Sequence, residues 1–404
     1  MNCSRRIFLR GAGLGVLGLG FRPSSFLVRA AQAAEGRVLV ALFQRGAADG
    51  LNMVVPYGDP DYYRIRSTIA IPRPGAVGGA VDLNGFFGLH PALSPLRPLY
   101  QAGEVAVIHA VGSPDNSRSH FDAQDFMETA APGIKNVRDG WLNRAAGDVP
   151  GTSVLEAVSV SNRIPRSLSG PETATAVRVV TDFDIRARNW RDEAERELTS
   201  MYGGTSWPAS RTGRETLDAV RVLRSVVGTV GQPQNGATYP AGSAGLALQQ
   251  AAQLIRAGVG LRIAFVDVPG WDHHSNETAQ LQTELTNLAS ALAAFHRDLG
   301  PRMADVLVMT MTEFGRTAGQ NGSNGTDHGH ASTMFVMGGT VRGGRVYGRW
   351  PGLSAQNLYQ GRDLDITTDF REVFAEAARA QLGVTNAGAV FPGWASTAPL
   401  GFMG

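Results

Sequence analysis

The chain has 404 residues, of which 43% are hydrophobic and 18% are charged, a composition that indicates a globular protein with a large core and excludes a disordered one. The formal net charge is +2, but five arginines lie in residues 1–33, and the remainder has 32 basic against 35 acidic residues. No basic stripe with interleaved aromatic residues occurs, which argues against a nucleic-acid-binding protein.

Residues 1–33 have the pattern of an export signal. The stretch "SRRIFLRGAGLGVLGLG" joins the arginine pair Arg5 and Arg6 to a short apolar run, and the following "AAQAAEG" offers small residues for cleavage, which we expect after Ala33. The arginine pair is of the twin-arginine type. The apolar run is rich in glycine and well short of the ~20 residues that a membrane-spanning helix needs. The signal therefore predicts no stable membrane span.

We accordingly expect a periplasmic or secreted protein that the twin-arginine export machinery carries out of the cytoplasm, with residues 34–404 as a single domain. The one cysteine, Cys3, lies inside the signal, so the exported chain would contain none. Its loss excludes disulfides, thiolate metal ligands and a cysteine nucleophile from the exported protein.

Apolar runs of strand length alternate with helical patterns along the rest of the chain. The predicted strands lie in residues 38–43, 104–112, 261–270, 305–315 and 333–339. The predicted helices lie in residues 90–103, 191–202, 210–227, 244–258 and 277–300. This alternation predicts an α/β fold with a central, mostly parallel sheet and helices on both faces. Ligands of such folds bind at the carboxyl ends of the strands.

Acids and histidines follow four of the predicted strands, and five of the eight histidines lie in these segments. Because the carboxyl ends of parallel strands meet at one edge of a sheet, we expect these side chains to lie near one another. In chain order they are Asp49; Ser117, Ser119, His120 and Asp122; Asp272, His273 and His274; Glu313; and Asp327, His328 and His330.

Carboxylate oxygens and imidazole nitrogens, without thiolates, suit a divalent metal ion, with zinc, manganese and calcium as the candidates. The polar stretch "NGSNGTDHGHAS", residues 321–332, is intelligible as a loop that such an ion orders. The alternative is that Asp327 forms an Asx-turn and that the neighbouring histidines are solvated.

Several of these residues also have a structural interpretation. Asp49 lies in "ADGLN", where Asp-Gly is a common turn pair, Glu313 has Arg316 nearby as an ion-pair partner, and Ser119 is placed to cap a helix. Three further histidines are expected to be structural: His90, His109 and His296.

Taken together, these segments resemble a twin-arginine-exported bacterial family of unknown function within the alkaline phosphatase and sulfatase superfamily. The segments that carry the resemblance run in order through most of the exported chain. They are "RGAADGLNMVVPYGD", "GLHPALSPLRPLYQAGEVAVIHAVG", "SRSHFDAQDFME", "GWDHH", "TEFGRTAGQNGSNGTDHG" and "TTDFREVFAEA".

The resemblance implies one large α/β domain, alkaline-phosphatase-like, with one or two metal ions. It implies that Asp49 is the ligand after the first strand, that Asp272 and His274 arrive together later, and that His328 is a final ligand. Ser119 matches the position of the nucleophile. The side-chain chemistry and the resemblance together predict six metal ligands. They are Asp49, Asp272, His274, Glu313, Asp327 and His328.

The chain departs from the pattern at three places. Glu313 and Phe314 stand where the superfamily has an Asp-His pair, which removes one histidine ligand. His273 stands where the family usually has Thr, so the sequence leaves open whether His273 or His274 binds the ion. Ala48 stands where the family usually has Asn.

The implied reaction is hydrolysis of a small anionic ester, of phosphate or sulfate, outside the cytoplasm, with a metal ion that activates a hydroxyl or water. Ser119 is the expected nucleophile, Arg118 the clamp on the anionic oxygens, and His120 the group that moves protons. An esterase or a metal-dependent phosphodiesterase stays open. The alternative from another class is a non-catalytic, metal-stabilised binding or assembly protein of the cell envelope.

Overall fold

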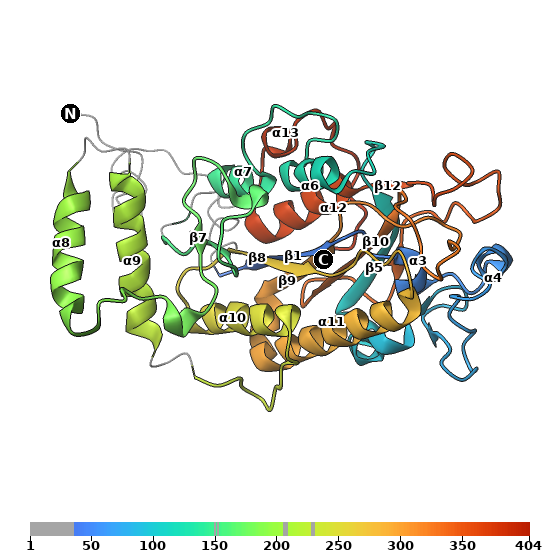
Figure 1. The fold of residues 1–404 in the computed structure, drawn as a ribbon, viewed down its shortest axis with the longest axis horizontal. Coiled ribbons are helices and arrows are strands. Elements are labelled where there is room, and N and C mark those ends of the chain that lie inside the picture. Colours follow the sequence, from blue (N-terminus) through green and yellow to red (C-terminus); the bar gives the residue numbers. More distant parts are fainter. Residues whose placement is uncertain (1–35, 149–150, 152, 205–208, 228–230) are drawn as a thin grey trace, which may run out of the picture. The chain divides into compact units, whose positions relative to one another are not determined.

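The computed structural model describes residues 36–148, 151, 153–204, 209–227 and 231–404. Its contacts divide the chain into two units, Met1–Gly36 and Arg37–Gly404, and the second is described here (Figure 1). The expected export signal, residues 1–33, lies outside the described residues. Within the described part, no helix is both long and apolar enough to cross a membrane.

A nine-stranded sheet forms the centre of the described unit. Its strand order is β11-β5-β10-β9-β1-β8-β6-β7, and β12 pairs with β5. The strands are β1 (Val38–Arg45), β5 (Val105–Gly112), β6 (Ala157–Ser159), β7 (Thr175–Ala176), β8 (Ile263–Pro269), β9 (Val306–Met311), β10 (Ser332–Gly338), β11 (Val346–Tyr347) and β12 (Thr368–Asp369). A small second sheet contains β2 (Val54–Val55), β3 (Val81–Asp82) and β4 (Gly88–Leu89).

Helices cover both faces of the large sheet. The α-helices are α3 (Gly50–Met53), α4 (Pro60–Ile65), α5 (Arg97–Gln101), α6 (His120–Thr129), α7 (Trp141–Asp148), α8 (Arg191–Gly203), α9 (Ser210–Val227), α10 (Ser243–Ala257), α11 (Glu277–Leu299), α12 (Phe370–Ala377) and α13 (Ala387–Val390). Shorter 3-10 segments are η1 (Pro91–Leu96), η2 (Arg166–Leu168), η3 (Val180–Asp182), η4 (Arg188–Trp190) and η5 (Gly300–Asp305), and η6 (Ala378–Leu382) is a π-helical segment.

The central strand β1 is apolar on both faces because both are covered. Leu42 belongs to the buried cluster that contains Leu285 of α11, and Phe43 belongs to the cluster on the opposite face that contains Trp141 of α7. Figure 1 shows α10 and α11 on one side of the sheet and α6, α7 and α12 on the other. The predicted α/β class, with a mostly parallel sheet between two layers of helices, is confirmed.

Strand β10 is antiparallel to both of its neighbours, β9 and β5, while β1 pairs in parallel with β8 and β9. The direction of β10 was not predicted, and it matters for the site. The carboxyl ends of β1, β5, β8 and β9 meet at one edge of the sheet, and an antiparallel strand begins at that edge. The loop before Ser332, which carries the histidines of residues 321–332, is thereby brought to the same edge.

One predicted helix differs from the structure. Residues 90–103 form the 3-10 segment η1 followed by the short helix α5, and not a continuous α-helix. Pro95 lies inside η1 and Pro98 in the first turn of α5. A proline inside an α-helix has no N–H to donate to the preceding turn and its ring clashes with the carbonyl four residues back, which explains the break.

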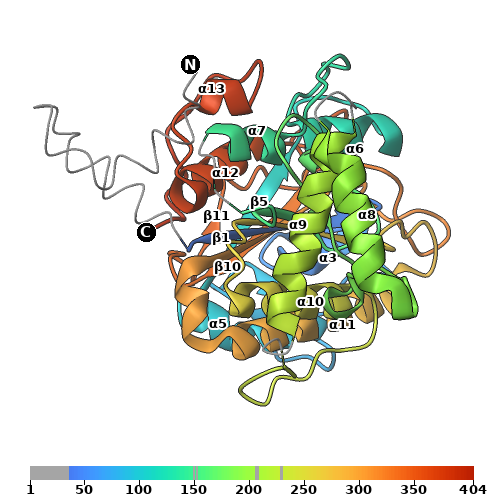
Figure 2. The same ribbon diagram turned by 90° about the vertical axis from the view of Figure 1, so that its left-hand side faces the viewer.

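Helices α8 and α9 lie side by side (Figures 1 and 2), and Figure 1 shows the pair on the side of the sheet where β7 lies. Helix α9 buries Leu217, Val220 and Leu223, whereas α8 buries none of its described side chains. This pair lies away from the sheet edge at which the acids and histidines gather.

Candidate metal centre

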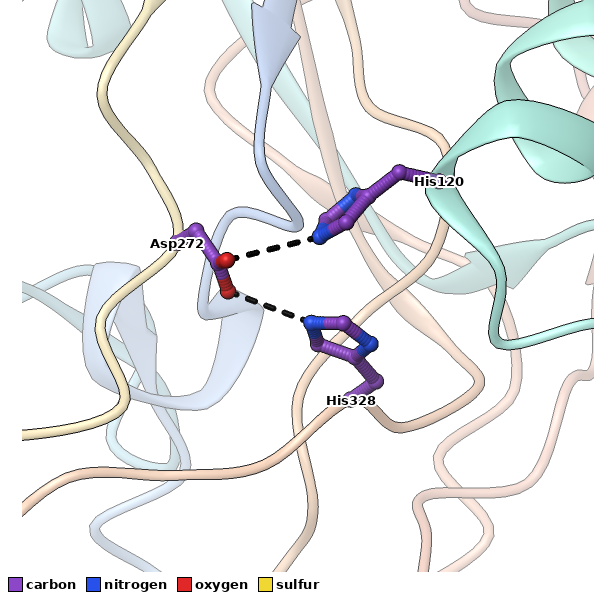
Figure 3. A group of neighbouring side chains, drawn as sticks. All are labelled: His120, Asp272 and His328. Atoms are coloured by element: carbon purple, nitrogen blue, oxygen red, sulfur yellow. Dashed lines mark hydrogen bonds and ion pairs between the residues drawn. The ribbon is translucent and has the colours of Figure 1, made fainter.

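Three side chains from distant parts of the sequence converge at the carboxyl edge of the sheet (Figure 3). His120 is the first residue of α6, Asp272 follows β8, and His328 lies in the loop that precedes β10. One potential ligand atom from each lies within 4.8 Å of the others. His120 Nε2 is 3.5 Å from Asp272 Oδ2, and His328 Nε2 is 3.2 Å from Asp272 Oδ1.

A fourth side chain, His274, joins this group. Its Nε2 atom lies 3.1 Å from Asp272 Oδ1 and 3.1 Å from His328 Nε2. The neighbouring His273 is buried instead beside Trp271, and neither of its ring nitrogens has a hydrogen-bond partner within the described part of the chain. Of the two adjacent histidines, the structure therefore places His274, and not His273, in the group.

Each of the three imidazoles is held through its Nδ1 atom by an oxygen that can only accept a hydrogen bond. The contacts are His120 Nδ1 to Glu313 Oε1 at 2.8 Å, His274 Nδ1 to Asp327 Oδ1 at 3.0 Å, and His328 Nδ1 to the carbonyl oxygen of Arg118 at 2.9 Å. In the neutral ring, Nδ1 then carries the hydrogen and Nε2 presents its lone pair to the group. Metal-binding histidines are typically oriented in this way.

The arrangement fits a divalent ion. Two Nε2 lone pairs 3.1 Å apart, those of His274 and His328, repel each other unless a cation or a proton lies between them. With Asp272 Oδ1, these nitrogens form a triangle with sides of 3.1, 3.1 and 3.2 Å. The edge of a tetrahedron around zinc with bonds of ~2.0 Å is ~3.3 Å. His120 Nε2 is buried and makes no hydrogen bond within the described residues, and its contact with Asp272 Oδ2 is 3.5 Å long, which leaves room for an ion to bind between the two atoms.

The charges around the group favour an ion as well. Partial burial alone would raise the pKa of Asp272, but Arg316, whose Nη1 donates to Asp272 at 2.6 Å, outweighs burial and lowers it. Asp327 has its pKa lowered by the hydrogen bond from His274. With neutral imidazoles, the three carboxylates of Asp272, Glu313 and Asp327 and the guanidinium of Arg316, which pairs with Asp272, together have an excess of two negative charges. A divalent ion would balance the charge of these four side chains.

Glu313 accepts a hydrogen bond from His120 and is itself held in place by further hydrogen bonds. Its side chain is fully buried, and Oε1 accepts hydrogen bonds from the Gly46 backbone N–H at 2.9 Å and from Gln124 at 2.9 Å, besides its contact with His120. Burial would raise the pKa of Glu313, but these hydrogen bonds lower it, so the carboxylate stays ionised. The hydrogen bond to Glu313 raises the pKa of His120, whereas burial lowers the pKa of His328.

The loop that carries His328 is folded back on itself by two glycines. The Gly315 N–H donates to the carbonyl of His330 at 2.8 Å, and the Gly329 N–H donates to the carbonyl of Gly315 at 2.8 Å. A Cβ atom on Gly315 would lie 1.8 Å from the Ala331 oxygen, and one on Gly329 would lie 2.3 Å from main-chain atoms of the opposite segment. Only glycine allows this close approach. Part of the loop's order thus comes from its own main chain.

The other predicted site residues lie as follows. Ser119 occupies the N-cap position of α6, but its side chain makes no capping hydrogen bond and is exposed. Arg118 forms an ion pair with the buried Asp363. Asp122 pairs with Lys135 at 3.0 Å.

Asp49 lies apart from the converging group. Arg66, which is fully buried, donates from Nη1 to Oδ2 and from Nη2 to Oδ1 of Asp49, the latter at 2.9 Å, and the Asn52 N–H adds a bond to Oδ2. Both oxygens of Asp49 are therefore bound by protein groups. Burial opposes ionisation of Asp49, but Arg66 outweighs it and lowers the pKa.

Sequence reasoning missed Arg66, Glu277 and Asp363, and it named Arg316 as a partner of Glu313, whereas Arg316 pairs with Asp272. All four are buried charged residues, and each has at least one partner 17 or more residues away in the sequence. Arg316 donates to Asp272, while Glu277 accepts from Asn52 and Thr326. A charged residue gives no local indication in the sequence that it is buried, so no sequence pattern identified these contacts.

The fold and the group of histidines define an α/β protein with a candidate metal centre at the carboxyl edge of its sheet. Residues 103–393 match the family described as "Protein of unknown function (DUF1501)", and the chain belongs to this family. No curated protein matches the chain.

Three solved structures illustrate what the chain is similar to. The lipoteichoic acid synthase LtaP from Listeria monocytogenes is 9% identical, with 76% of this chain and 66% of that chain covered and a TM-score of 0.35. The phosphonate monoester hydrolase from Silicibacter pomeroyi is 11% identical, with 87% and 74% covered and a TM-score of 0.40. A sulfatase from Pseudoalteromonas sp. is 9% identical, with 90% and 73% covered and a TM-score of 0.36. These values assign no activity to the chain.

Proposed function

We propose that this protein is an exported, metal-dependent hydrolase of phosphate or sulfate esters whose ion is bound by His120, Asp272, His274 and His328. One observation carries the proposal: three imidazoles, each held at Nδ1 by an oxygen, direct their Nε2 atoms toward one carboxylate. The order of the sequence segments that resemble the alkaline phosphatase and sulfatase superfamily supports the reaction class.

The donor set bears on the identity of the ion. Three nitrogens and one carboxylate oxygen suit zinc, and suit manganese or iron less closely, whereas calcium binds almost only oxygen. Sequence analysis placed Glu313 and Asp327 among the ligands. In this proposal they do not bind the ion, and each accepts a hydrogen bond from the Nδ1 atom of a histidine that does. His120 likewise becomes a ligand and not the proton carrier, since its Nε2 points toward Asp272.

A divalent ion in such a site supplies Lewis acidity and neutralises developing negative charge. Ser119, exposed and next to His120, is the proposed nucleophile. Its Oγ would bond to the phosphorus or sulfur of the ester as the bond to the alcohol oxygen breaks, and the hydroxyl proton would pass through solvent to the departing alcohol. Water would then attack the same phosphorus or sulfur, release phosphate or sulfate and return a proton to the Ser119 oxygen. The guanidinium of Arg316 lowers the pKa of Asp272, so its carboxylate is ionised at neutral pH and can bind a cation.

The test is an assay of purified protein loaded separately with zinc, manganese and calcium. Aryl phosphate, aryl phosphodiester, aryl sulfate and aryl acetate would be compared for wild type and for Asp272→Asn. We expect metal-dependent turnover of at least one of the three anionic esters and its loss in Asp272→Asn. Turnover of the neutral acetate alone would overturn the proposed substrate class in favour of an esterase.

A non-catalytic protein of the cell envelope, stabilised by the same ion, is the second candidate. One observation favours it: the Ser119 hydroxyl makes no hydrogen bond to a base within the described residues. The same purified protein separates the two candidates. A binding or assembly protein would gain thermal stability with the ion but would turn over none of the four esters.

Export is part of the proposal and rests on the sequence of residues 1–33. The expected partner is the twin-arginine machinery, and the expected location is the periplasm or the medium. Changing Arg5 and Arg6 to Lys should leave the protein in the cytoplasm with its signal attached. Unchanged export of the doubly substituted protein would refute this part without touching the metal centre.

A further inference from the structure

Two arginines flank one buried carboxylate beside the candidate metal centre. Arg118 donates from Nε at 3.2 Å and from Nη2 to Oδ2 of Asp363, and Arg362 donates from Nε to Oδ1 at 3.0 Å. The Asp363 side chain is fully buried. A carboxylate held between two guanidinium groups fixes both of them in place before any ligand arrives, which reduces the entropy lost on binding.

Both arginines also contact the residue that lies at the centre of the site. The carbonyl oxygen of Arg118 accepts from His328 Nδ1 at 2.9 Å, and Nη2 of Arg362 donates to the carbonyl oxygen of His328. The main chain of Arg118 therefore orients the His328 ring, whose other nitrogen points at Asp272, and the guanidinium of Arg362 lies against the main chain of the same residue.

The segment that carries Arg362 is itself held against the site. Tyr359 stacks on His330 with ring centroids 4.2 Å apart, and the Ala318 N–H donates to the carbonyl of Arg362 at 3.1 Å. Gln360 adopts φ +55° and accepts from Nη2 of Arg118 at 3.0 Å. A left-handed backbone is unfavourable at a residue other than glycine, so the surrounding contacts must hold it there.

The pair has unused hydrogen-bonding capacity. Among the residues that the structure describes, Nη1 of neither guanidinium has a hydrogen-bond partner. The Arg118 side chain is 27% exposed and that of Arg362 is 47% exposed. One carboxylate neutralises only one of the two guanidinium groups, so the trio of Arg118, Arg362 and Asp363 has an excess of one positive charge.

We propose that Arg118 and Arg362 together bind the non-bridging oxygens of the ester's phosphate or sulfate group, and that Arg362 makes the site specific for anionic esters. The inference rests on the proposed function and adds the residue that selects its substrate class. Planar guanidinium groups match oxyanions through paired N–H donors. A neutral carboxylic ester offers no anionic oxygen, so Arg362 contributes nothing to its binding.

The experiment measures the affinity of inorganic phosphate and of inorganic sulfate for zinc-loaded protein by titration calorimetry. Wild type is compared with Arg362→Gln, Arg362→Lys and, as a matched control, Arg97→Gln in the exposed first turn of α5, which leads into the opposite end of β5. We expect roughly tenfold or greater weakening in Arg362→Gln, because a charge-assisted hydrogen bond is lost. The anion affinity of Arg362→Lys should lie between those of wild type and Arg362→Gln, and the affinity of Arg97→Gln should equal that of wild type.

A second readout separates substrate selection from a structural effect. Arg362→Gln should raise KM for whichever aryl phosphate or sulfate is turned over, with little change in kcat, and should leave any hydrolysis of aryl acetate unaltered. The zinc content of each variant is measured alongside. If Arg362→Gln does not fold, Arg362→Lys decides in its place, since it keeps the charge but loses the paired donors.

The two proposals fail in different ways. Wild-type affinity for phosphate and sulfate in zinc-loaded Arg362→Gln overturns the role of Arg362 and leaves the metal centre intact. Wild-type protein that binds zinc but neither anion also overturns it. Wild-type protein that takes up no divalent ion overturns the proposed function, and the anion titration of that metal-free protein still decides whether the arginines bind an oxyanion.

Discussion

The replacement Glu277→Gln should change how the stability of this protein depends on pH. Glu277 is the first residue of α11 and is fully buried; Oε1 accepts from Asn52 Nδ2 at 3.1 Å, and Oε2 accepts from Thr326 at 2.6 Å. Asp49 lies beside it and is kept ionised by Arg66. Burial and the charge of Asp49 raise the pKa of Glu277 to about 8. Asp49 and Arg66 already balance, so an ionised Glu277 would be an uncompensated buried charge.

The sign follows from the direction of this shift. Between the unfolded pKa of about 4.5 and the folded pKa of about 8, the folded protein keeps a proton on Glu277 that the unfolded chain has released. The free energy of unfolding that this group contributes is therefore fully present below about pH 4.5 and is lost as pH rises through 8. One proton corresponds to a slope of at most about 1.4 kcal/mol per pH unit. Glutamine does not titrate, so this slope should vanish.

The assay is urea unfolding at pH 5, 6, 7, 8 and 9 in the presence of a chelator, which removes any contribution from metal binding. The difference in unfolding free energy between wild type and Glu277→Gln should change steadily with pH, in favour of the variant at high pH. Glu197→Gln on the exposed side of α8 is the matched control and should parallel wild type. A Glu277→Gln profile parallel to that of wild type would refute the reasoning.

Three further predictions concern the charges around the site. Arg66→Met should lower the free energy of urea unfolding by roughly 3–5 kcal/mol, because Asp49 is left buried without its partner. Glu313→Gln should weaken zinc binding by about 10–100-fold in chelator competition, since a ligand of the ion loses its orienting carboxylate. Ser119→Ala should reduce turnover by several orders of magnitude with zinc still bound and with little change in melting temperature, because Ser119 makes no capping hydrogen bond.

Each of these has its own control or contrary result. Arg64→Met, which removes an arginine that pairs with Asp61 at the surface, should cost about 1 kcal/mol or less. Unaltered zinc affinity in Glu313→Gln would mean that His120 needs no orienting partner. Ser119→Ala protein that retains most of its rate would exclude a serine ester, and the reacting group would then be a water molecule.

Local sequence pattern was sufficient for the strands of the central sheet and most of the long helices. The apolar runs at β1, β5, β8 and β9 and the helical patterns of α9, α10 and α11 lie where they were predicted, because each element buries its apolar side chains whatever its neighbours are. The direction of β10 was not predictable in this way. Its pairing with β5 and β9 depends on partners far away in the chain, and an apolar run of residues does not indicate whether the strand is parallel or antiparallel to its neighbours.

For the site, the sequence predicted which segments meet but not which atoms face one another. Asp272, His274 and His328 do converge, since each follows or precedes a strand end at the same edge. The choice between His273 and His274, and the placement of Asp327 behind an imidazole, depend on the course of a loop. Such detail is fixed by side-chain packing, which leaves no periodic signal in the sequence.

The pairing of Asp49 with Arg66 is a second case in which the sequence did not predict the side-chain contacts. Asp49 follows the first strand as expected, but its carboxylate is bound by an arginine seventeen residues later and not directed at the histidines. The sequence places the acid at the correct edge, while a buried partner decides what it binds.

The central claim is that His120, Asp272, His274 and His328 bind a divalent ion. The most direct measurement is the ion content per chain, by elemental analysis after loading with zinc and removal of the excess, for wild type, His274→Gln and His273→Gln. The account predicts close to one ion per chain in wild type, a large loss in His274→Gln, and retention in His273→Gln, whose ring lies outside the group. Wild-type protein without a bound ion, or equal losses in the two variants, would contradict it.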